Sequence, residues 1–144
     1  MNVFDFLEAA QKIDLNYEIP LSLIESREDY LMLQKDQLAH GLRSDGEQIF
    51  NVKTGSKKYS PKYAKYKGKD EPIDLRDKGD FYGGIFVKIE GIDSIVVDSA
   101  DSKSGKLQEN YGNEIFTLDD ENQNAFNPIA QQNLILGIEK QLSK

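Results

Sequence analysis

The sequence predicts a single α+β domain, residues 1–144, in which a small antiparallel sheet is packed by N- and C-terminal helices. Three observations support this class. Residues 85–98 have the pattern of one β-hairpin, apolar residues recur at helical spacing near both ends, and residues 51–73 are Lys/Tyr-rich without regular periodicity. We expect this last segment to be an extended loop or arm of the same domain, because long irregular connections are uncommon in compact domains unless they have a function.

The hairpin has the clearest pattern in the chain. From Ile85 to Ile89, every second residue is a β-branched aliphatic residue, which indicates a half-buried strand. Residues 90–93 form a short polar turn that contains a glycine. Residues 94–98 then predict a returning strand rich in β-branched residues.

Two helices are expected before the arm. Residues 2–15 carry apolar residues near helical spacing and predict a short amphipathic helix. A second helix is expected from about Leu21 to His40, with Pro20 in its first turn and Gly41 as its C-terminal stop. Its apolar stripe would consist of residues seven apart, namely Ile24, Leu31 and Leu38.

The remaining elements are shorter or lie near the end. Residues 49–52 could form a short strand, and residues 61–67 one helical turn within the arm. A short helix is expected over 102–110. Residues 119–122 are interpreted as an acidic turn, and the last helix is expected to begin at Asn127 as cap and Pro128 in the first turn.

Composition excludes several classes of protein. The chain has no cysteine, so it has neither disulfides nor thiolate zinc sites, and no apolar run is long enough for a membrane span. The formal net charge of −7 disfavours a general nucleic-acid binder. The charge is unevenly distributed, however, because seven of the 18 basic residues lie within residues 51–69, where no acidic residue occurs. We therefore expect an acidic body with one basic arm.

No group of residues predicts an active site, so we expect no catalytic residues, no cofactor and no metal, and a protein that is not an enzyme. His40 is the only histidine, and its position at a helix end favours a structural role. Asp74, Asp77 and Asp80 could in principle hold a hard cation. Arg76 and Lys78 lie between them, so ordinary turn chemistry before a strand is the favoured interpretation.

The arm is the leading candidate for an interaction site. Its lysines alternate with tyrosines, which could neutralise phosphates and stack on bases, or could contact an acidic protein neighbour, including another copy of this chain. A solvated loop is the third interpretation. The candidate interaction residues are the arm residues together with two phenylalanines that could equally be core: Lys53, Lys57, Lys58, Tyr59, Lys62, Tyr63, Lys65, Tyr66, Lys67, Phe81 and Phe126.

Three segments resemble the virion-morphogenesis family of tailed bacteriophages, the small neck and tail-completion proteins. The first is Asp74–Phe81 (DLRDKGDF), where the family has an apolar residue, a polar one and Thr-Gly before a strand, with Lys78 in place of the usual Thr. The second is Leu107–Gly112 (LQENYG), the end of a short helix after a hairpin. The third is Asn124–Pro128 (NAFNP), which stands where the family has Arg-Pro-Phe-x-x-Pro, without the Arg and the first Pro.

The resemblance covers about residues 74–142 and implies a structural protein of a phage or prophage-derived particle. The expected role is a head–tail connector (neck) or tail-completion subunit in an oligomeric ring, located in the virion after assembly in the host bacterial cytoplasm. Expected partners are further copies and neighbouring portal, adaptor or tail proteins, with possible non-specific DNA contact and no membrane. In such a ring the arm could reach the acidic face of a neighbour around Asp119–Glu121.

Two alternatives from other classes remain open. The first is a nucleic-acid-associated module that uses the basic arm. The second, less favoured, is an enzyme with a carboxylate-based site, because paired carboxylates can be found in so acidic a chain.

Overall fold

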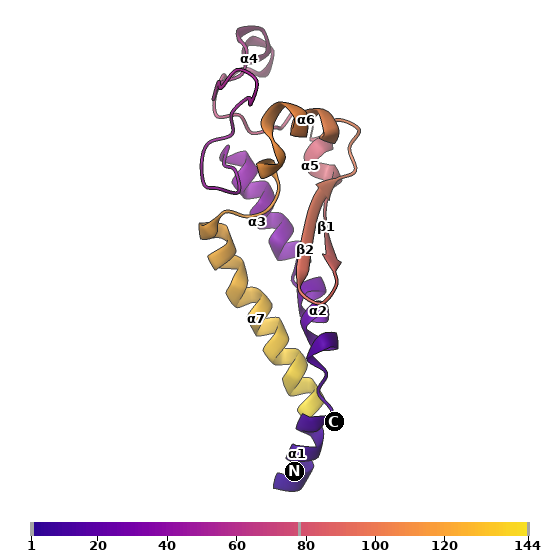
Figure 1. Cartoon of the computed structure of the whole chain (residues 1–144). Coiled ribbons are helices and arrows are strands. Elements are labelled where there is room, and N and C mark those ends of the chain that lie inside the picture. The colour runs from indigo at the N-terminus through magenta and orange to yellow at the C-terminus, as the bar shows by residue number, and fades with distance from the viewer. Residues whose placement is uncertain (1, 78, 144) are drawn as a thin grey trace.

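The computed structural model describes residues 2–77 and 79–143 and has the predicted α+β class. Lys78, which belongs to the first of the three segments above, lies outside the described residues. The molecule is elongated, with α1 at one end and α4 and α6 at the other (Figure 1). The elements in chain order are α1 (Val3–Gln11), α2 (Leu15–Glu25), α3 (Arg27–Ala39), α4 (Pro61–Lys67), α5 (Asp80–Gly84), β1 (Ile85–Glu90), β2 (Ser94–Ser99), α6 (Ser104–Tyr111), the 3-10 helix η1 (Asn113–Ile115) and α7 (Asp120–Leu142).

The hairpin is confirmed and positions the helices around it. β1 pairs with β2 in antiparallel register from Ile85 opposite Ser99 to Glu90 opposite Ser94. Burial in β1 alternates from the buried Ile85, as the period of two predicted. α2 and α3 pack against β1, and the long α7 packs in turn against α2 and α3 (Figure 1).

The predicted helix 21–40 is wrong in its start and its continuity. α2 begins at Leu15, because Asp14 is its N-cap and accepts a hydrogen bond from the Asn16 N–H. Pro20 therefore lies inside α2 rather than in its first turn. Ser26 then separates α2 from α3.

The end of α3 follows the prediction. His40 is its C-cap, and Gly41 follows with a φ of 73°. A Cβ on Gly41 would lie 2.5 Å from that of Pro72, so glycine is required both by the backbone conformation and by the packing.

The last helix also begins earlier than predicted. Asp119 is the N-cap of α7, and its side chain accepts the Asn122 N–H at 2.8 Å. Residues 119–122 are therefore a helix start and not a turn, and Pro128 lies inside the helix. Acidic residues are favoured there because the first turn of a helix carries partial positive charge.

The core lies where α3, α5, η1, the hairpin and the start of α7 meet. Its fully buried side chains include Leu38, Ile49, Ile73, Ile115 and Phe126. Phe126 is 2 % exposed and meets the Tyr30 ring edge-on, with 5.0 Å between centroids. It is a core residue, so it is not available as an anchoring group. Ile49 is also core, but the predicted strand over 49–52 does not form.

Two buried glutamines join α3 to the segment that leads into α7. Gln34 donates from Nε2 to the Ile115 carbonyl oxygen at 3.1 Å. Gln37 donates to the Thr117 carbonyl oxygen at 3.0 Å and accepts the Asp119 N–H at 2.8 Å. These bonds satisfy backbone groups that would otherwise be buried without partners, so they fix the start of α7 on α3.

Candidate interaction surface

The arm, residues 51–73, has a short helix at its centre. Ser60 caps α4 by accepting the Tyr63 N–H, Pro61 occupies the first turn, and Gly68 ends the helix in the left-handed conformation with a φ of 87°. The helical turn predicted over 61–67 is therefore confirmed. Most residues of the arm are exposed, and α4 projects beyond the rest of the molecule (Figure 1).

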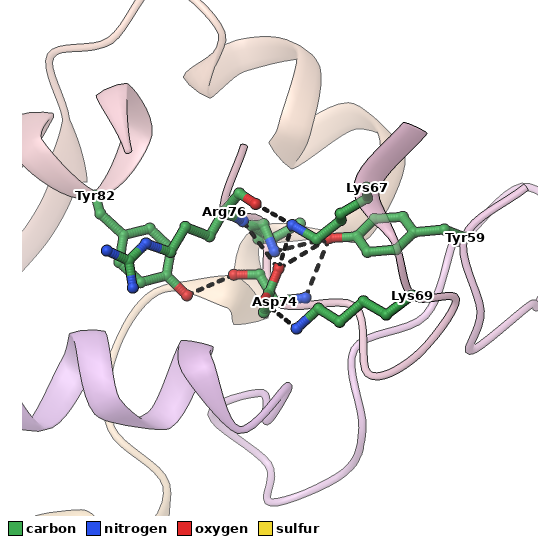
Figure 2. A network of polar contacts seen from close by, with 7 residues as sticks. Tyr59, Lys67, Lys69, Asp74, Arg76 and Tyr82 are labelled. Carbon is green, nitrogen blue, oxygen red and sulfur yellow. Dashed lines mark hydrogen bonds and ion pairs between the residues drawn. The ribbon is translucent and has the colours of Figure 1, made fainter. Parts of the chain in front are cut away.

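The base of the arm is held by the buried carboxylate of Asp74 (Figure 2). The Lys67 Nζ lies 2.9 Å from Asp74 Oδ1, and the Lys69 Nζ lies 2.7 Å from Oδ2. Each carboxylate oxygen therefore has its own ammonium partner. Buried charges are tolerated in proteins when they are paired and hydrogen-bonded in this way. Asp74 therefore holds the base of the arm through its ion pairs with Lys67 and Lys69, and we call these three residues the Asp74 socket.

The Tyr59 hydroxyl belongs to the same network and lies on the side of Asp74 where the two lysines lie (Figure 2). It accepts the backbone N–H groups of Asp74 and Leu75 at 3.1 and 3.0 Å and donates to Asp74 Oδ1 at 3.2 Å. Leu75 has a φ of 59°, a conformation that costs a residue with a side chain about 1–2 kcal/mol. The hydroxyl compensates by satisfying the N–H groups at this strained bend.

The network shifts the titration of its members. Burial opposes ionisation of Asp74, but hydrogen bonds from Lys69, Lys67 and the Arg76 N–H outweigh it, so the pKa of Asp74 is lowered. Burial is also the largest cause acting on Tyr59, and it raises the pKa of that phenol well above its usual value. At neutral pH Asp74 is therefore the ionised member and Tyr59 is a neutral hydrogen-bond donor and acceptor.

The arm lysines divide into two groups. Four form ion pairs within the chain: Lys67 and Lys69 with Asp74, Lys53 with Glu109 at 3.1 Å, and Lys58 with Asp70 at 4.0 Å. Within the part of the chain that the structure describes, the other three form no ion pair: Lys57, Lys62 and Lys65. This second group is the set available to an external partner.

The expected acceptor surface around residues 119–121 needs a correction. Asp119 is 5 % exposed, and its side chain is occupied as the cap of α7. It therefore cannot take part in docking an arm, although Asp120 and Glu121 beside it are exposed.

A cavity of about 710 Å³ lies between the arm and the α5–α6 end of the body. The arm contributes Tyr59 and Tyr63, and α6 contributes Leu107 and Tyr111. Phe81, a candidate residue, is largely core at 4 % exposed but also reaches this lining. Polar residues complete the wall, among them Lys58, Asp77, Asp80 and Lys103. Aromatic and aliphatic side chains gathered among polar ones are typical of a site that holds a partly apolar group.

The arm tyrosines are stacked rather than separately presented to solvent. The ring centroids of Tyr59 and Tyr63 are 4.9 Å apart, and those of Tyr63 and Tyr66 are 5.8 Å apart. The series runs from the half-buried Tyr59 to Tyr66, which is 67 % exposed. Tyr66 at the outer end is therefore open to solvent, whereas Tyr59 and Tyr63 line the cavity.

Two further candidates from the sequence, the Asp74 group and His40, take part in contacts within the fold. The Asp74 carboxylate faces lysines, and within the described residues no group of three or more potential ligands could hold a metal ion. The His40 Nδ1 lies 2.8 Å from the Asp36 carbonyl oxygen at the end of α3, where a helix favours positive charge.

A second surface was not among the sequence candidates. α1 contains no buried residue, and its Val3 and Phe4 are 70 % and 81 % exposed. Further exposed apolar side chains follow on α1 and α2: Phe6, Leu7, Leu15, Tyr17 and Ile24. The sequence shows the amphipathic spacing of residues 2–15. It does not show whether the same chain covers the apolar face of this helix.

Comparison with known protein-family models, curated proteins and solved structures finds no match for this chain. Among residues 2–77 and 79–143, no helix has the length and apolar character needed to cross a membrane.

Proposed function

We propose that this chain is a structural subunit of a phage or prophage-derived particle, a head–tail connector or tail-completion protein that assembles into a ring. It acts by contact with other protein subunits and transforms no substrate. Its contact surfaces are α1 with the start of α2, and the arm with the adjoining cavity.

One observation carries the proposal: every large apolar side chain of α1 is exposed, from 48 % for Phe6 to 81 % for Phe4. Burying one large apolar side chain is worth about 1.5–3 kcal/mol, and Val3, Phe4 and Leu7 all lie on this one helix. Apolar residues gathered on an exposed helix are typical of a surface that is covered by another protein. A nine-residue helix is too short to be stable in water by itself. α7 of the same chain contacts α1, and a partner on the exposed face would stabilise the helix further.

The particle assignment is supported by the resemblance described above together with the site. Two of the three segments that carry the resemblance line the same cavity: Leu75, Asp77, Asp80 and Phe81 from the first, and Leu107, Asn110 and Tyr111 from the second. Residues of these two segments are therefore gathered around one cavity.

Light scattering of the purified chain over a range of concentrations tests the proposal. We expect masses that are multiples of 16.3 kDa, or larger assemblies when candidate portal or tail proteins are added. A mass of one chain at every concentration, together with no binding to those proteins, would contradict it.

A nucleic-acid-associated module is the second candidate, because the arm carries the exposed Lys57, Lys62 and Lys65 together with Tyr66, which is 67 % exposed. Phosphate contacts release counterions, so such binding should weaken steeply as salt is added. Absence of binding to single- and double-stranded DNA at low salt would remove this candidate.

A further inference from the structure

We infer that α1 of one copy docks in the cavity beside the arm of the next copy, which gives a head-to-tail contact between subunits. This inference rests on the proposed function, since it names the contact that would join one ring subunit to the next. Three features of the described residues carry it: the exposed face of α1, the lining of the cavity, and the charges at the two ends of the molecule.

The first feature is α1, which is already folded as a capped helix in the single chain and presents apolar side chains to a cavity of another copy. Asn2 accepts the Asp5 N–H at 2.9 Å, and the Asp5 side chain accepts the Asn2 N–H, so a complete capping box starts the helix. Phe4 and Leu7 are three residues apart and therefore project from one face. An aromatic side chain that is 81 % exposed at the end of a molecule is a suitable anchor for a pocket.

The second feature is the cavity, which offers such an anchor an aromatic wall. Its apolar lining includes Tyr59, Tyr63, Leu107 and Tyr111, and its volume of about 710 Å³ is within the range of pockets that bury a compact ligand. Phe4 and Leu7 could enter together. Aromatic rings prefer edge-to-face or offset contacts with other rings, which a wall with several tyrosines can provide.

The third feature is charge. Residues 2–14 around α1 contain three acidic residues and one lysine, namely Asp5, Glu8, Asp14 and Lys12. The arm has the opposite character, with seven lysines against Asp70 and Glu71. Lys12 is already paired with Glu8, whereas Lys57, Lys62 and Lys65 form no ion pair within the described residues. The acidic end of one copy would therefore be steered toward the basic end of another.

The two surfaces lie at opposite ends of the elongated molecule, so one copy cannot bring its own α1 to its own cavity (Figure 1). A contact between two different surfaces of identical subunits is heterologous. Repeating it gives a ring when the rotation closes and a filament when it does not.

Disulfide trapping tests the contact, because the chain has no cysteine of its own. Val3→Cys, which leaves Phe4 and Leu7 in place on α1, and Lys103→Cys would be carried by full-length chains with tags of different size, mixed and oxidised. Lys103 is exposed and lines the cavity, so its replacement should leave the fold intact. We expect the mixed disulfide to dominate over both homodimers. The matched control mixes Met32→Cys with Lys103→Cys, since Met32 is 70 % exposed but lies on α3.

The possible outcomes separate the inference from the proposed function. A mixed disulfide confined to the Val3→Cys pair supports the docking. A Val3→Cys homodimer alone would overturn it, because α1 would then pair with α1 of another copy. Assemblies of normal mass without the mixed disulfide would overturn the docking and leave the structural function standing. A chain that stays monomeric alone and with candidate particle proteins would overturn both.

The mass of two serine variants gives a second, independent measurement. Phe4→Ser should reduce the mass measured by light scattering to that of a single chain at concentrations where the unmodified chain assembles. Met32→Ser removes an apolar side chain of similar exposure and should leave the mass unchanged. Equal effects of the two substitutions would overturn the docking.

Discussion

At the scale of single residues, Asp74 determines how the arm is attached to the body. In the sequence, its carboxylate is a possible cation ligand with Asp77 and Asp80. The structure instead places two ammonium groups on it, both from lysines of the arm. The sequence gives no signal for this pairing, because lysine and aspartate are common on any surface. The interaction arises from burial, which makes a carboxylate costly unless cations satisfy it.

The substitution Asp74→Asn should destabilise the protein by about 3 kcal/mol, because it leaves the buried Lys67 ammonium without a counter-charge. Chemical denaturation followed by circular dichroism would measure the change. Asp70→Asn is the matched control: its pair with Lys58 is exposed and 4.0 Å long, so its effect should be close to zero. Equal losses of stability in the two variants would contradict the role of Asp74 in holding the arm.

The same pair predicts a dependence on acid. The pKa of Asp74 is lower in the folded chain than in the unfolded chain, so its contribution to stability is full above the unfolded value of about 4 and is lost as pH falls through the folded value. Asp74→Asn should therefore show a shallower loss of stability below about pH 4 than the unmodified protein.

Tyr59 gives the corresponding prediction in alkali. Burial raises its pKa in the folded state, so its contribution to stability is full below the unfolded value of about 10 and is lost as pH rises above that value. Tyr59→Phe should lose about 1–3 kcal/mol at neutral pH, since two backbone N–H groups lose their acceptor. Its stability should then decline less steeply above about pH 10.

Denaturation at several pH values, with the exposed Tyr66→Phe as control, would measure both effects. Parallel alkaline profiles for Tyr59→Phe and the unmodified chain would contradict the assignment.

At the scale of elements, the hairpin and the helix of the arm followed from local rules, whereas two helix starts did not. The sequence placed Pro20 and Pro128 in first turns, because proline is favoured there. In both helices an upstream aspartate, Asp14 or Asp119, is the cap instead, and the proline lies inside. The signal was present in residues 119–122, since an acidic cluster suits a first turn as well as it suits a loop. Local pattern alone did not decide between these interpretations.

The choice at α7 is made by tertiary contacts from α3. Gln37 accepts the Asp119 N–H and the Asn122 side-chain amide and donates to the Thr117 carbonyl oxygen, so it holds the helix start from outside. This role of Gln37 could not be predicted from the sequence, because glutamine is ordinarily an exposed helix former.

Gln37→Ala should therefore cost more than an ordinary helix-surface substitution. It leaves the buried Asp119 N–H without its acceptor, at about 1–3 kcal/mol, and removes the part-buried bond to the Thr117 carbonyl oxygen. Gln131→Ala, on the exposed part of α7, should be within about 0.5 kcal/mol of the unmodified chain. Amide hydrogen exchange should show faster exchange in the first turns of α7 for Gln37→Ala. Unchanged protection there would contradict the role assigned to Gln37.

At the scale of the whole molecule, the sequence predicted an acidic body with a basic arm, and the structure adds where these charges lie. The arm is at the end opposite α1, which the linear order of residues does not reveal (Figure 1). The cavity could not be predicted either, since Tyr63 and Tyr111 are 48 positions apart and meet only because the Asp74 socket folds the arm back toward α6. The sequence therefore predicted the class of the fold and the composition of the surface but not its geometry.

The separation of charge leads to a prediction about assembly rate. Lys62→Glu with Lys65→Glu should leave the monomer as stable as before, because neither lysine forms an ion pair within the described residues. Association at low salt should become slower, since the arm would lose its attraction for the acidic end of the next copy. A matched control, Lys88→Glu with Lys140→Glu, changes the net charge equally on exposed positions outside the arm.

Time-resolved light scattering would follow both double variants from low to high salt. We expect the arm variant alone to assemble slowly at low salt, and the difference between the two to disappear near 1 M salt, where the screening length is about 3 Å. Equal rates at low salt would mean that net charge, and not the position of the arm lysines, governs association. A difference that persists at high salt would assign those lysines to direct packing in the interface, because screening leaves such contacts intact.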